Sequence, residues 1–429
     1  MTTAEETPRH TGNYNHSRYF QNSTTTVATA PQKHSLEKNE TKPMKTKQNT
    51  DPQHGSLNKS KLNQTVLEAN STLWNIGIPK STSSRAPDKL TPLPVPDKLT
   101  PLQVLYKKDF QKMPNWTTND VYLQSNEPIQ RSCAESLHKI KDPDIQKAFM
   151  PSIQMYLYQN LLNQSEWNRL AHFNNPFGFM EYNYSDIKKV VDLIPKPRST
   201  QLLPLPENNT CSRCAVVANG GILYGSKMGQ EIDAHHYVFR TNGAVIKGHE
   251  EDVGNRTSVY VHTAFSLVTS LTVFKKYGFN KIPSDEGIKY VMIPEGLRDF
   301  LLYPLSPRPW TYYEGFDESR FYVLHPDFLR YIRNRFMTSK QQDGKHWAMY
   351  RPTNGAFTLF LALHVCDTVD AYGFITENHR NYSNYYFEKN QKTKVIFYIN
   401  HDYNLEIKTW QKLHNAKIIR LYQHDGRQT

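Results

Sequence analysis

The chain of 429 residues lacks any apolar run long enough to span a bilayer, and it does not open with a signal peptide. If the native protein is anchored in a membrane, the anchor is missing from this sequence. Acidic residues are in the minority, at 40 Asp and Glu against 52 Lys and Arg, so the formal net charge is +12. Such an excess steers anionic ligands, nucleic acid or a membrane surface towards a protein without distinguishing among them.

Cysteine is scarce, with only four in the chain. Cys211 and Cys214 have the C-x-x-C spacing of a zinc site, but the chain has no second C-x-x-C, and Cys133 and Cys366 stand alone. Asn-x-Ser/Thr sequons occur along the chain at Asn22, Asn39, Asn63, Asn70, Asn115, Asn163, Asn183, Asn208, Asn255 and Asn381. Together they favour a lumenal or secreted compartment, where an even cysteine count indicates disulfides. We therefore expect two disulfides in preference to zinc.

Several functional motifs are also missing. A Gly-Gly turn follows the strand-like Ala215–Ala218, but the chain lacks G-x-G-x-x-G and an acidic residue at a strand end about 20 residues later, which disfavours a dinucleotide-dependent oxidoreductase. The positive charge is dispersed and no nucleic-acid-binding motif is present, so we expect no nucleic acid partner. Asp142-Pro143-Asp144 is a D-x-D pattern that holds a metal in some glycosyltransferases, but no strand precedes it, and it is interpreted as the start of a helix.

Residues 1–105 are predicted to be a disordered stem. They are rich in Thr, Asn, Lys, Gln, Ser and Pro and have little apolar periodicity, so they cannot offset the entropy lost on ordering. A short repeat, Pro87–Leu93 and again Pro96–Leu102, stiffens the end of this arm. Residues 106–429 are predicted to form a single catalytic domain.

In that domain strand-like and helix-like segments alternate, which predicts a doubly wound α/β sheet of Rossmann-like type. The expected strands are Ala215–Ala218, Tyr237–Arg240, Ser258–His262, Lys289–Ile293, Phe321–Leu324, Thr368–Gly373 and Lys394–Ile399. The expected helices are Asp144–Leu162, Tyr184–Leu193, Leu267–Tyr277, Asp327–Phe336 and Gly355–His364.

Two of these strands end in an Asn-Gly turn. Asn219 follows the first, and Asn242 follows the second. Because the carboxyl ends of parallel strands meet at one edge, where open α/β sheets bind ligands, both amides are expected at that edge. The glycine-rich turn also lets backbone N–H groups approach an anion.

Two further features belong to the same edge. Thr353-Asn354-Gly355 opens a helix whose N-terminus is suited to an anion, although Thr and Asn are common as plain helix caps. His401 follows the expected strand Lys394–Ile399, where its usual pKa suits proton abstraction near neutral pH, and Glu406 is placed to support the loop. A histidine at a strand end is also often only structural, so His401 alone does not define a function.

Four segments in order resemble the motifs of the eukaryotic sialyltransferases. They are the long motif Cys214–Thr257, the short motif Tyr350–Gly373, the third motif Tyr385–Glu388 and the very short motif His401-x-x-x-x-Glu406. Within that family the sequence looks most like the N-acetylgalactosaminide α-2,6-sialyltransferases. Cys211-x-x-Cys214-Ala-Val-Val and the closing Ile-Ile-Arg-Leu-Tyr-Gln carry this likeness, and the long Thr/Pro arm is typical of the first enzyme of that subgroup.

The resemblance implies a modified glycosyltransferase-A fold in a type II Golgi membrane protein. It implies transfer of sialic acid from CMP-sialic acid to the 6-hydroxyl of GalNAc linked to Ser or Thr, with inversion and with neither metal nor cofactor. By position, it implies His401 as general base and a CMP-sialic acid site built by Asn219, Asn242, Thr353, Asn354, Gly355 and Gly373. It also implies the disulfides Cys214–Cys366 and Cys133–Cys211.

Two positions depart from the family pattern. Ala218 stands where relatives usually have Gly, and its methyl group is expected to crowd the loop. Tyr385 stands where relatives often have His, so either Tyr385 or nearby His379 would have to assist phosphate departure. These departures leave open an alternative, a catalytically impaired glycan-binding protein or a sialyltransferase of another linkage. The sequence does not fix the preferred O-glycan core, the sialic acid variant or the oligomeric state.

Overall fold

The computed structural model describes residues 103–127, 133–134, 136–140, 142–199, 201–204, 211–297, 299, 317–388 and 393–424. The predicted stem, residues 1–105, lies almost entirely outside these ranges, and its boundary stays a prediction. Within the described part of the chain, no helix is long and apolar enough to cross a membrane.

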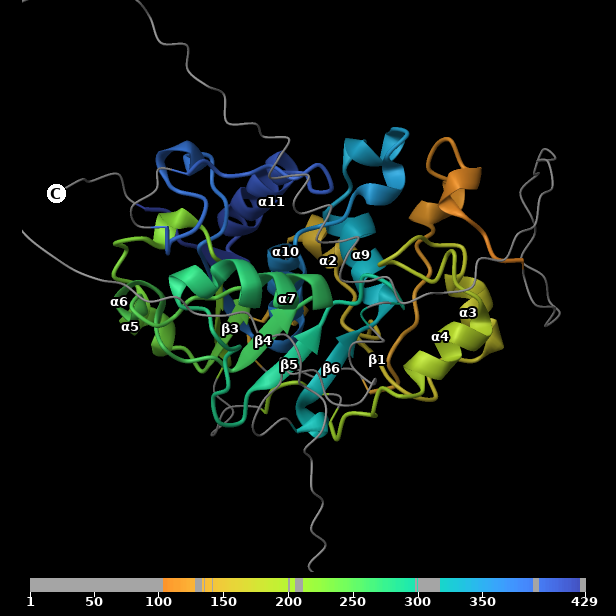
Figure 1. Ribbon diagram of the computed structural model, residues 1–429, viewed down its shortest axis with the longest axis horizontal. Coiled ribbons are helices and arrows are strands. Elements are labelled where there is room, and N and C mark those ends of the chain that lie inside the picture. Colours follow the sequence, from red (N-terminus) through yellow and green to blue (C-terminus); the bar gives the residue numbers. More distant parts are fainter. Residues whose placement is uncertain are drawn as a thin grey trace, which may run out of the picture. The chain divides into compact units, whose positions relative to one another are not determined.

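The described residues form one eight-stranded sheet in the order β1-β6-β5-β4-β3-β2-β7-β8 (Figure 1). Every neighbouring pair is parallel except β1 and β6, which are antiparallel. The strands are β1 Tyr156–Leu157, β2 Arg213–Val217, β3 Tyr237–Thr241, β4 Val259–His262, β5 Lys289–Met292, β6 Phe321–Leu324, β7 Thr368–Tyr372 and β8 Ile419–Leu421. The α/β fold class expected from the alternating segments is therefore confirmed.

Helices cover the sheet, with α7 in front and α10 behind in Figure 1. The α-helices are α2 Pro143–Ala148, α3 Gln164–Leu170, α4 Tyr184–Val191, α5 Gly229–Asp233, α6 Glu250–Val253, α7 Ala264–Val273, α9 Pro326–Phe336, α10 Asn354–Val365 and α11 Tyr403–Asn415. Short 3-10 turns lie between them, including η6 Phe274–Tyr277, which continues α7. Helix α10 is apolar on nearly every side because it is buried against β2, β3, β7 and α9.

The sheet reverses direction of winding at β2. The chain runs from β2 through β3, β4, β5 and β6 on one side, and then returns to place β7 on the other side of β2. The loops that leave β2 and β7 therefore diverge, which opens a crevice at their carboxyl ends. This topology fixes where a ligand site is expected.

Three of the sequence expectations about elements were wrong or incomplete. The expected helix Asp144–Leu162 ends at Ala148, and the chain then pairs Tyr156 with Leu324 as an edge strand. The expected strand Lys394–Ile399 has no strand partner, because the free side of β7 is taken by β8, which the sequence reasoning missed. The expected helix Tyr184–Leu193 ends at Val191 as α4, which lies with α3 beyond the β1 edge (Figure 1).

Two disulfides join distant parts of the chain, in the pairings that the resemblance implies. Cys214 in β2 is bonded to Cys366, the residue that follows α10, across 152 positions of sequence. Cys133 is bonded to Cys211, just before β2. The first bond is fully buried and fastens the C-terminal end of α10 to β2.

Candidate functional site

A cavity of about 420 Å3 opens above the carboxyl ends of β2, β3 and β7. All of the polar and glycine site residues predicted from the sequence line it, namely Asn219, Asn242, Thr353, Asn354, Gly355, Gly373, His379, Tyr385, His401 and Glu406. They come from seven separate segments of the chain, and the sheet edge brings them together as expected.

The floor of the cavity depends on two glycines in contact. The backbone N–H of Gly220 donates to the carbonyl oxygen of Gly373 at 2.9 Å. Gly373 has φ +70°, and a Cβ there would lie 2.5 Å from the carbonyl oxygen of Ala218. Only glycine satisfies both conditions, so the approach of these two loops is encoded by residue type.

Asn219 offers an unpaired acceptor to a ligand. Its Nδ2 donates to the carbonyl oxygen of Thr241 at 3.1 Å, which fixes the orientation of the amide. Its Oδ1 is buried and has no partner among the described residues. A buried acceptor without a partner costs free energy, so this oxygen is suited to a ligand hydroxyl and unsuited to a phosphate.

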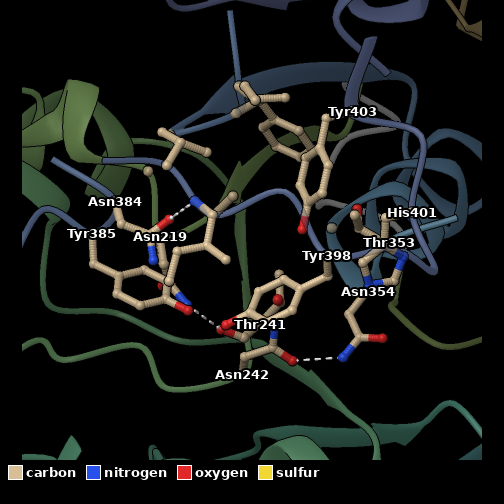
Figure 2. A pocket seen from close by; sticks show the side chains of 18 of the residues that line it. Asn219, Thr241, Asn242, Thr353, Asn354, Asn384, Tyr385, Tyr398, His401 and Tyr403 are labelled. Carbon is tan, nitrogen blue, oxygen red and sulfur yellow. Dashed lines mark hydrogen bonds between the residues drawn. The ribbon is translucent and has the colours of Figure 1, made fainter. Parts of the chain in front are cut away.

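A chain of polar contacts runs along the opposite side of the cavity (Figure 2). Asn354 Nδ2 donates to Asn242 Oδ1 at 2.7 Å, and the guanidinium Nη2 of Arg351 donates to Asn354 Oδ1 at 2.7 Å. The same Nη2 lies 2.5 Å from a carboxylate oxygen of Glu295. Because the oxygen of Asn242 is engaged, its amide nitrogen is left as a donor for an anionic ligand.

Asn242 also holds an unusual backbone conformation. Its φ is +54°, a left-handed value that asparagine tolerates better than most residues. The hydroxyl of Tyr260 donates to its carbonyl oxygen at 2.5 Å. The turn after β3 is therefore held on both the side-chain and the main-chain side, which orients the Asn242 amide into the cavity.

His401 lines the cavity as a neutral imidazole. Its Nδ1 lies 2.9 Å from the carbonyl oxygen of Arg351, so Nδ1 carries the proton and Nε2 keeps its lone pair. Burial, together with the nearby Arg351 guanidinium, lowers the pKa of His401 to about 4, so the ring is neutral at physiological pH. A neutral imidazole with a free Nε2 can accept a proton from a ligand hydroxyl.

Glu406 ties the His401 loop to the helix that faces the ligand. Its carboxylate accepts from both the backbone N–H and the hydroxyl of Thr353, each at 2.9 Å, and the Thr353 hydroxyl in turn caps α10 through Ala356 N. Burial raises the pKa of Glu406 to about 7. These contacts join the start of α11, just after His401, to the N-terminus of α10.

Tyr385 lines the cavity, with its ring packed on Phe387 and its hydroxyl group pointing into the cavity. Its ring stacks on Phe387 with centroids 5.1 Å apart, and burial raises the pKa of its hydroxyl. The hydroxyl groups of Tyr385, Tyr398 and Tyr403 point into the cavity in Figure 2. His379 lines the same cavity, with Nδ1 bound to the carbonyl oxygen of Thr376 at 3.0 Å.

The backbone at Ala218 has a conformation that does not require glycine. Its φ is not among the positive values of this chain, its N–H donates to the carbonyl oxygen of Tyr372 at 2.8 Å, and the residue is only half-buried. Ala218 lines the cavity in an ordinary backbone conformation, and the crowding expected from its methyl group stays a prediction.

Sequence reasoning did not predict Tyr398, Tyr403, Arg351 and Glu295 among the cavity residues. Tyr398 and Tyr403 flank His401 by three and two positions, and Arg351 lies in the short motif Tyr350–Gly373, so proximity to a motif was an available signal. Glu295 follows β5 and carries no motif, and only the fold brings it to Arg351.

Metal ligands do not gather in the described part of the chain, where no group of three or more His, Cys, Asp or Glu side chains could hold an ion. The D-x-D pattern has the local role predicted for it. Asp142 caps α2 by accepting from Ile145 N at 3.0 Å.

Comparison with known proteins gives independent evidence about the family of this chain. A profile of the family described as "Glycosyltransferase family 29 (sialyltransferase)" matches residues 156–418. The protein named alpha-N-acetylgalactosaminide alpha-2,6-sialyltransferase 1 of Homo sapiens is 46% identical over 346 residues, which cover 76% of this chain and 57% of that protein. The protein named alpha-N-acetylgalactosaminide alpha-2,6-sialyltransferase 2 of Mus musculus is 42% identical over 311 residues, covering 68% and 83%. This chain thus spans little more than half the length of the human relative.

A solved structure agrees on the fold. The "Crystal Structure of a Mammalian Sialyltransferase in complex with Gal-beta-1-3GalNAc-ortho-nitrophenol" aligns with a TM-score of 0.50, covering 69% of this chain and 100% of that one. The two sequences are 22% identical, so this likeness bears on the fold alone.

Proposed function

The chain belongs to glycosyltransferase family 29, the sialyltransferases, and we propose that it transfers sialic acid from CMP-sialic acid to the 6-hydroxyl of GalNAc on Ser or Thr. The acceptor and the linkage come from the names of relatives that are 42% to 46% identical. The observation that carries the proposal is the neutral His401, whose free Nε2 lies at a cavity lined by donor-rich turns.

The proposed step is a displacement at the anomeric carbon of sialic acid. The acceptor 6-oxygen forms a bond to that carbon, the bond to the CMP phosphate oxygen breaks with its electron pair, and the hydroxyl proton passes to His401 Nε2. A primary alcohol is a weak nucleophile, and a positioned base contributes typically about 10²–10⁴-fold in rate. His401 has the tautomer and charge state that this role requires.

The leaving group, CMP, departs as a phosphate monoester whose charge must be stabilised. The Asn242 amide nitrogen and the N-terminus of α10 at Asn354 and Gly355 supply donors without a metal. The unpaired Oδ1 of Asn219 suits a sugar hydroxyl of the nucleotide. Tyr385 and His379 are the candidate groups for assisting phosphate departure, with Tyr385 acting through its hydroxyl.

The proposal extends to the setting of the enzyme. The two disulfides fit an oxidising lumen, and we place the native protein in the Golgi as a type II membrane protein. Its partners are then CMP-sialic acid, mucin-type glycoproteins and the Golgi membrane.

The test is transfer of labelled sialic acid to a GalNAc-Thr peptide in the presence of EDTA, with wild type, His401→Ala and His172→Ala. His172 is the matched control because its Nδ1 also binds a carbonyl oxygen, that of Asn168 at 2.9 Å, and it does not line the cavity. Wild type and His172→Ala are expected to form product at similar rates, and His401→Ala to lose about 10²–10⁴-fold.

Two results would contradict the proposal. Full activity of His401→Ala would show that His401 is not the base. Loss of activity in EDTA that returns with a divalent ion would show that the reaction needs a metal. A folded wild type that binds CMP and GalNAc-Thr without any turnover would establish the impaired glycan-binding alternative, with Tyr385 as the first residue to restore to His.

A further inference from the structure

The segment Ile396–Ile399 has the composition of a buried strand and is nevertheless exposed. The exposed fractions are 46% for Ile396, 46% for Phe397, 50% for Tyr398 and 69% for Ile399. The other large exposed apolar side chains in the described ranges stand singly. Scattered apolar residues need no explanation, but a contiguous exposed run marks a surface that contacts something.

This run lies between two cavities. On one side is the donor cavity described above. On the other is a second cavity of about 450 Å3, which we call the outer groove and which is lined by Gln341, Gly344, Lys345, His346, Phe397, Tyr398, Ile399, His401, Asp402, Tyr403 and Asn404. Three residues, Tyr398, His401 and Tyr403, line both. His401, the proposed base, therefore stands where the two spaces meet.

The residues that line the outer groove are of two chemical kinds. One set is apolar, with Phe397 stacked on Tyr403 at a centroid distance of 4.6 Å and an interplanar angle of 26°, and with Ile399 beside them in sequence. The other set consists of the exposed residues Gln341, Gly344, Lys345 and His346 from one segment of the chain. The Gln341 amide donates to the carbonyl oxygen of His401 at 3.3 Å, which connects this segment to the proposed base.

Charge in the groove favours a neutral or weakly acidic occupant. The nearest carboxylate, that of Asp402, is already engaged by the hydroxyl of Ser339 at 2.6 Å and by the N–H of Leu405 at 3.0 Å. Lys345 is exposed at the rim. Aromatic and aliphatic side chains facing hydrogen-bonding groups across a groove are the arrangement that binds extended, proline-containing polypeptide.

Resting on the proposed function, we propose that the outer groove binds the polypeptide that carries the GalNAc acceptor. The acceptor 6-hydroxyl must reach His401 while CMP-sialic acid fills the donor cavity, so the rest of the acceptor must leave His401 on the other side. A Ser/Thr/Pro-rich chain in extended form places proline rings on Phe397 and Ile399 and backbone carbonyl groups towards Gln341 and Lys345. A further saccharide, covered with hydroxyls, gains little from an aliphatic surface such as Ile399.

The test compares three acceptors at saturating CMP-sialic acid. They are GalNAc on a single blocked threonine, the same GalNAc on a Thr-Pro-containing peptide, and galactosylated GalNAc on the single threonine. The variant is Ile399→Ser, which removes the most exposed apolar side chain of the run. The matched control is Leu193→Ser, at 52% exposure, which lines neither cavity.

In wild type, kcat/KM for the peptide acceptor is expected to exceed that for the single threonine by about tenfold or more, because an apolar contact is gained only with the peptide. In Ile399→Ser this ratio is expected to fall about fivefold, through KM of the peptide acceptor, while Leu193→Ser keeps the wild-type ratio. An unchanged Kd for CMP shows that Ile399→Ser is folded at the donor cavity.

Three outcomes would overturn the assignment. Equal kcat/KM for peptide and single threonine in wild type would show that the polypeptide is not bound, with the proposed function intact. A loss in Ile399→Ser confined to the galactosylated acceptor would assign the groove to the glycan. Transfer to none of the three acceptors would defeat the proposed function itself and this assignment with it.

Discussion

The Nδ1 atom of His401 lies 2.9 Å from the carbonyl oxygen of Arg351, and the guanidinium of Arg351 lies 2.7 Å from the amide oxygen of Asn354. The carbonyl oxygen of Arg351 thus fixes the tautomer of the proposed base, His401. Its guanidinium fixes the orientation of the Asn354 amide at the proposed CMP-sialic acid site. A shift of Arg351 would disturb both halves of the reaction at once.

The pH dependence of transfer follows from the environment of His401. Burial and the Arg351 guanidinium lower its pKa from 6.5 to about 4, and a base acts only when unprotonated. The rate due to this group is therefore expected to persist as pH falls from 7 to 5 and to be lost only near 4. Initial rates between pH 5 and 8, with circular dichroism as a check on folding, measure this. An acidic limb with its midpoint near 6.5 would contradict the assigned environment.

Stability is expected to depend on pH through Glu406. Its pKa is raised from 4.5 in a solvated chain to about 7 in the fold, so the folded state holds its proton where the unfolded state has released it. The free energy of unfolding then falls as pH rises from 4.5 to 7, by up to about 3 kcal/mol. Glu406→Gln should flatten this dependence, measured as Tm against pH. Glu251→Gln, at an exposed position, is the control and should follow wild type.

Exchange of a methyl group should cost much more stability at Gly373 than at Ala218. Gly373→Ala places a Cβ 2.5 Å from the Ala218 carbonyl oxygen at φ +70°, so a loss of at least about 2 kcal/mol in stability and a loss of CMP binding are expected. Ala218→Gly removes a methyl group from an ordinary backbone conformation and should cost under about 1 kcal/mol. Urea unfolding and CMP titration of both variants measure this. Similar effects in the two would refute the geometric account.

Two substitutions at Asn242 separate the effect of losing its side-chain amide from the effect of backbone strain. Asn242→Gly keeps the φ of +54° accessible and deletes the amide that binds Asn354, so the Kd for CMP should rise about tenfold with little loss of stability. Asn242→Ala deletes the same amide and adds strain, so it should also lower Tm. Wild-type CMP affinity in Asn242→Gly would exclude the amide from the donor site.

The two disulfides should differ in their effect on activity. Replacing Cys214 and Cys366 with Ser frees the end of α10 from β2, and removal of such a bond costs typically about 2–5 kcal/mol, so we expect loss of secretion or of transfer. Cys133 and Cys211 belong to no strand or helix, and their bond does not hold α10, so the double Ser variant there should lose stability while the secreted fraction keeps kcat. Normal secretion and activity without the Cys214–Cys366 bond would defeat its proposed clamping role.

The sequence anticipated most of the sheet because its central strands are short apolar runs bounded by turn residues, and such runs have one stable placement, in the middle of a covered sheet. Lys394–Ile399 has the same composition and failed as a strand. Strand formation needs a free neighbouring edge, and β8 takes the edge of β7. Pairing partners are a property of the whole fold, so no local pattern of residues 394–399 could reveal this.

The candidate site divides in the same way. The sequence by itself determined which groups the motifs supply: Asn219 and Asn242 after their strands, the Thr353 cap of a helix, and His401 with Glu406 five residues later. The strand expected before His401 did not form. Turns, helix caps and the presence of a titratable side chain depend on residue types within a few positions of one another, so the sequence alone determines them. Only the tertiary structure decided that Glu295 meets Arg351, that His401 is buried to a pKa of about 4, and that the run Ile396–Ile399 stays exposed between two cavities. Burial and long-range pairing arise from contacts between segments far apart in the chain, and those contacts set both the charge on the base and the shape of the space around it.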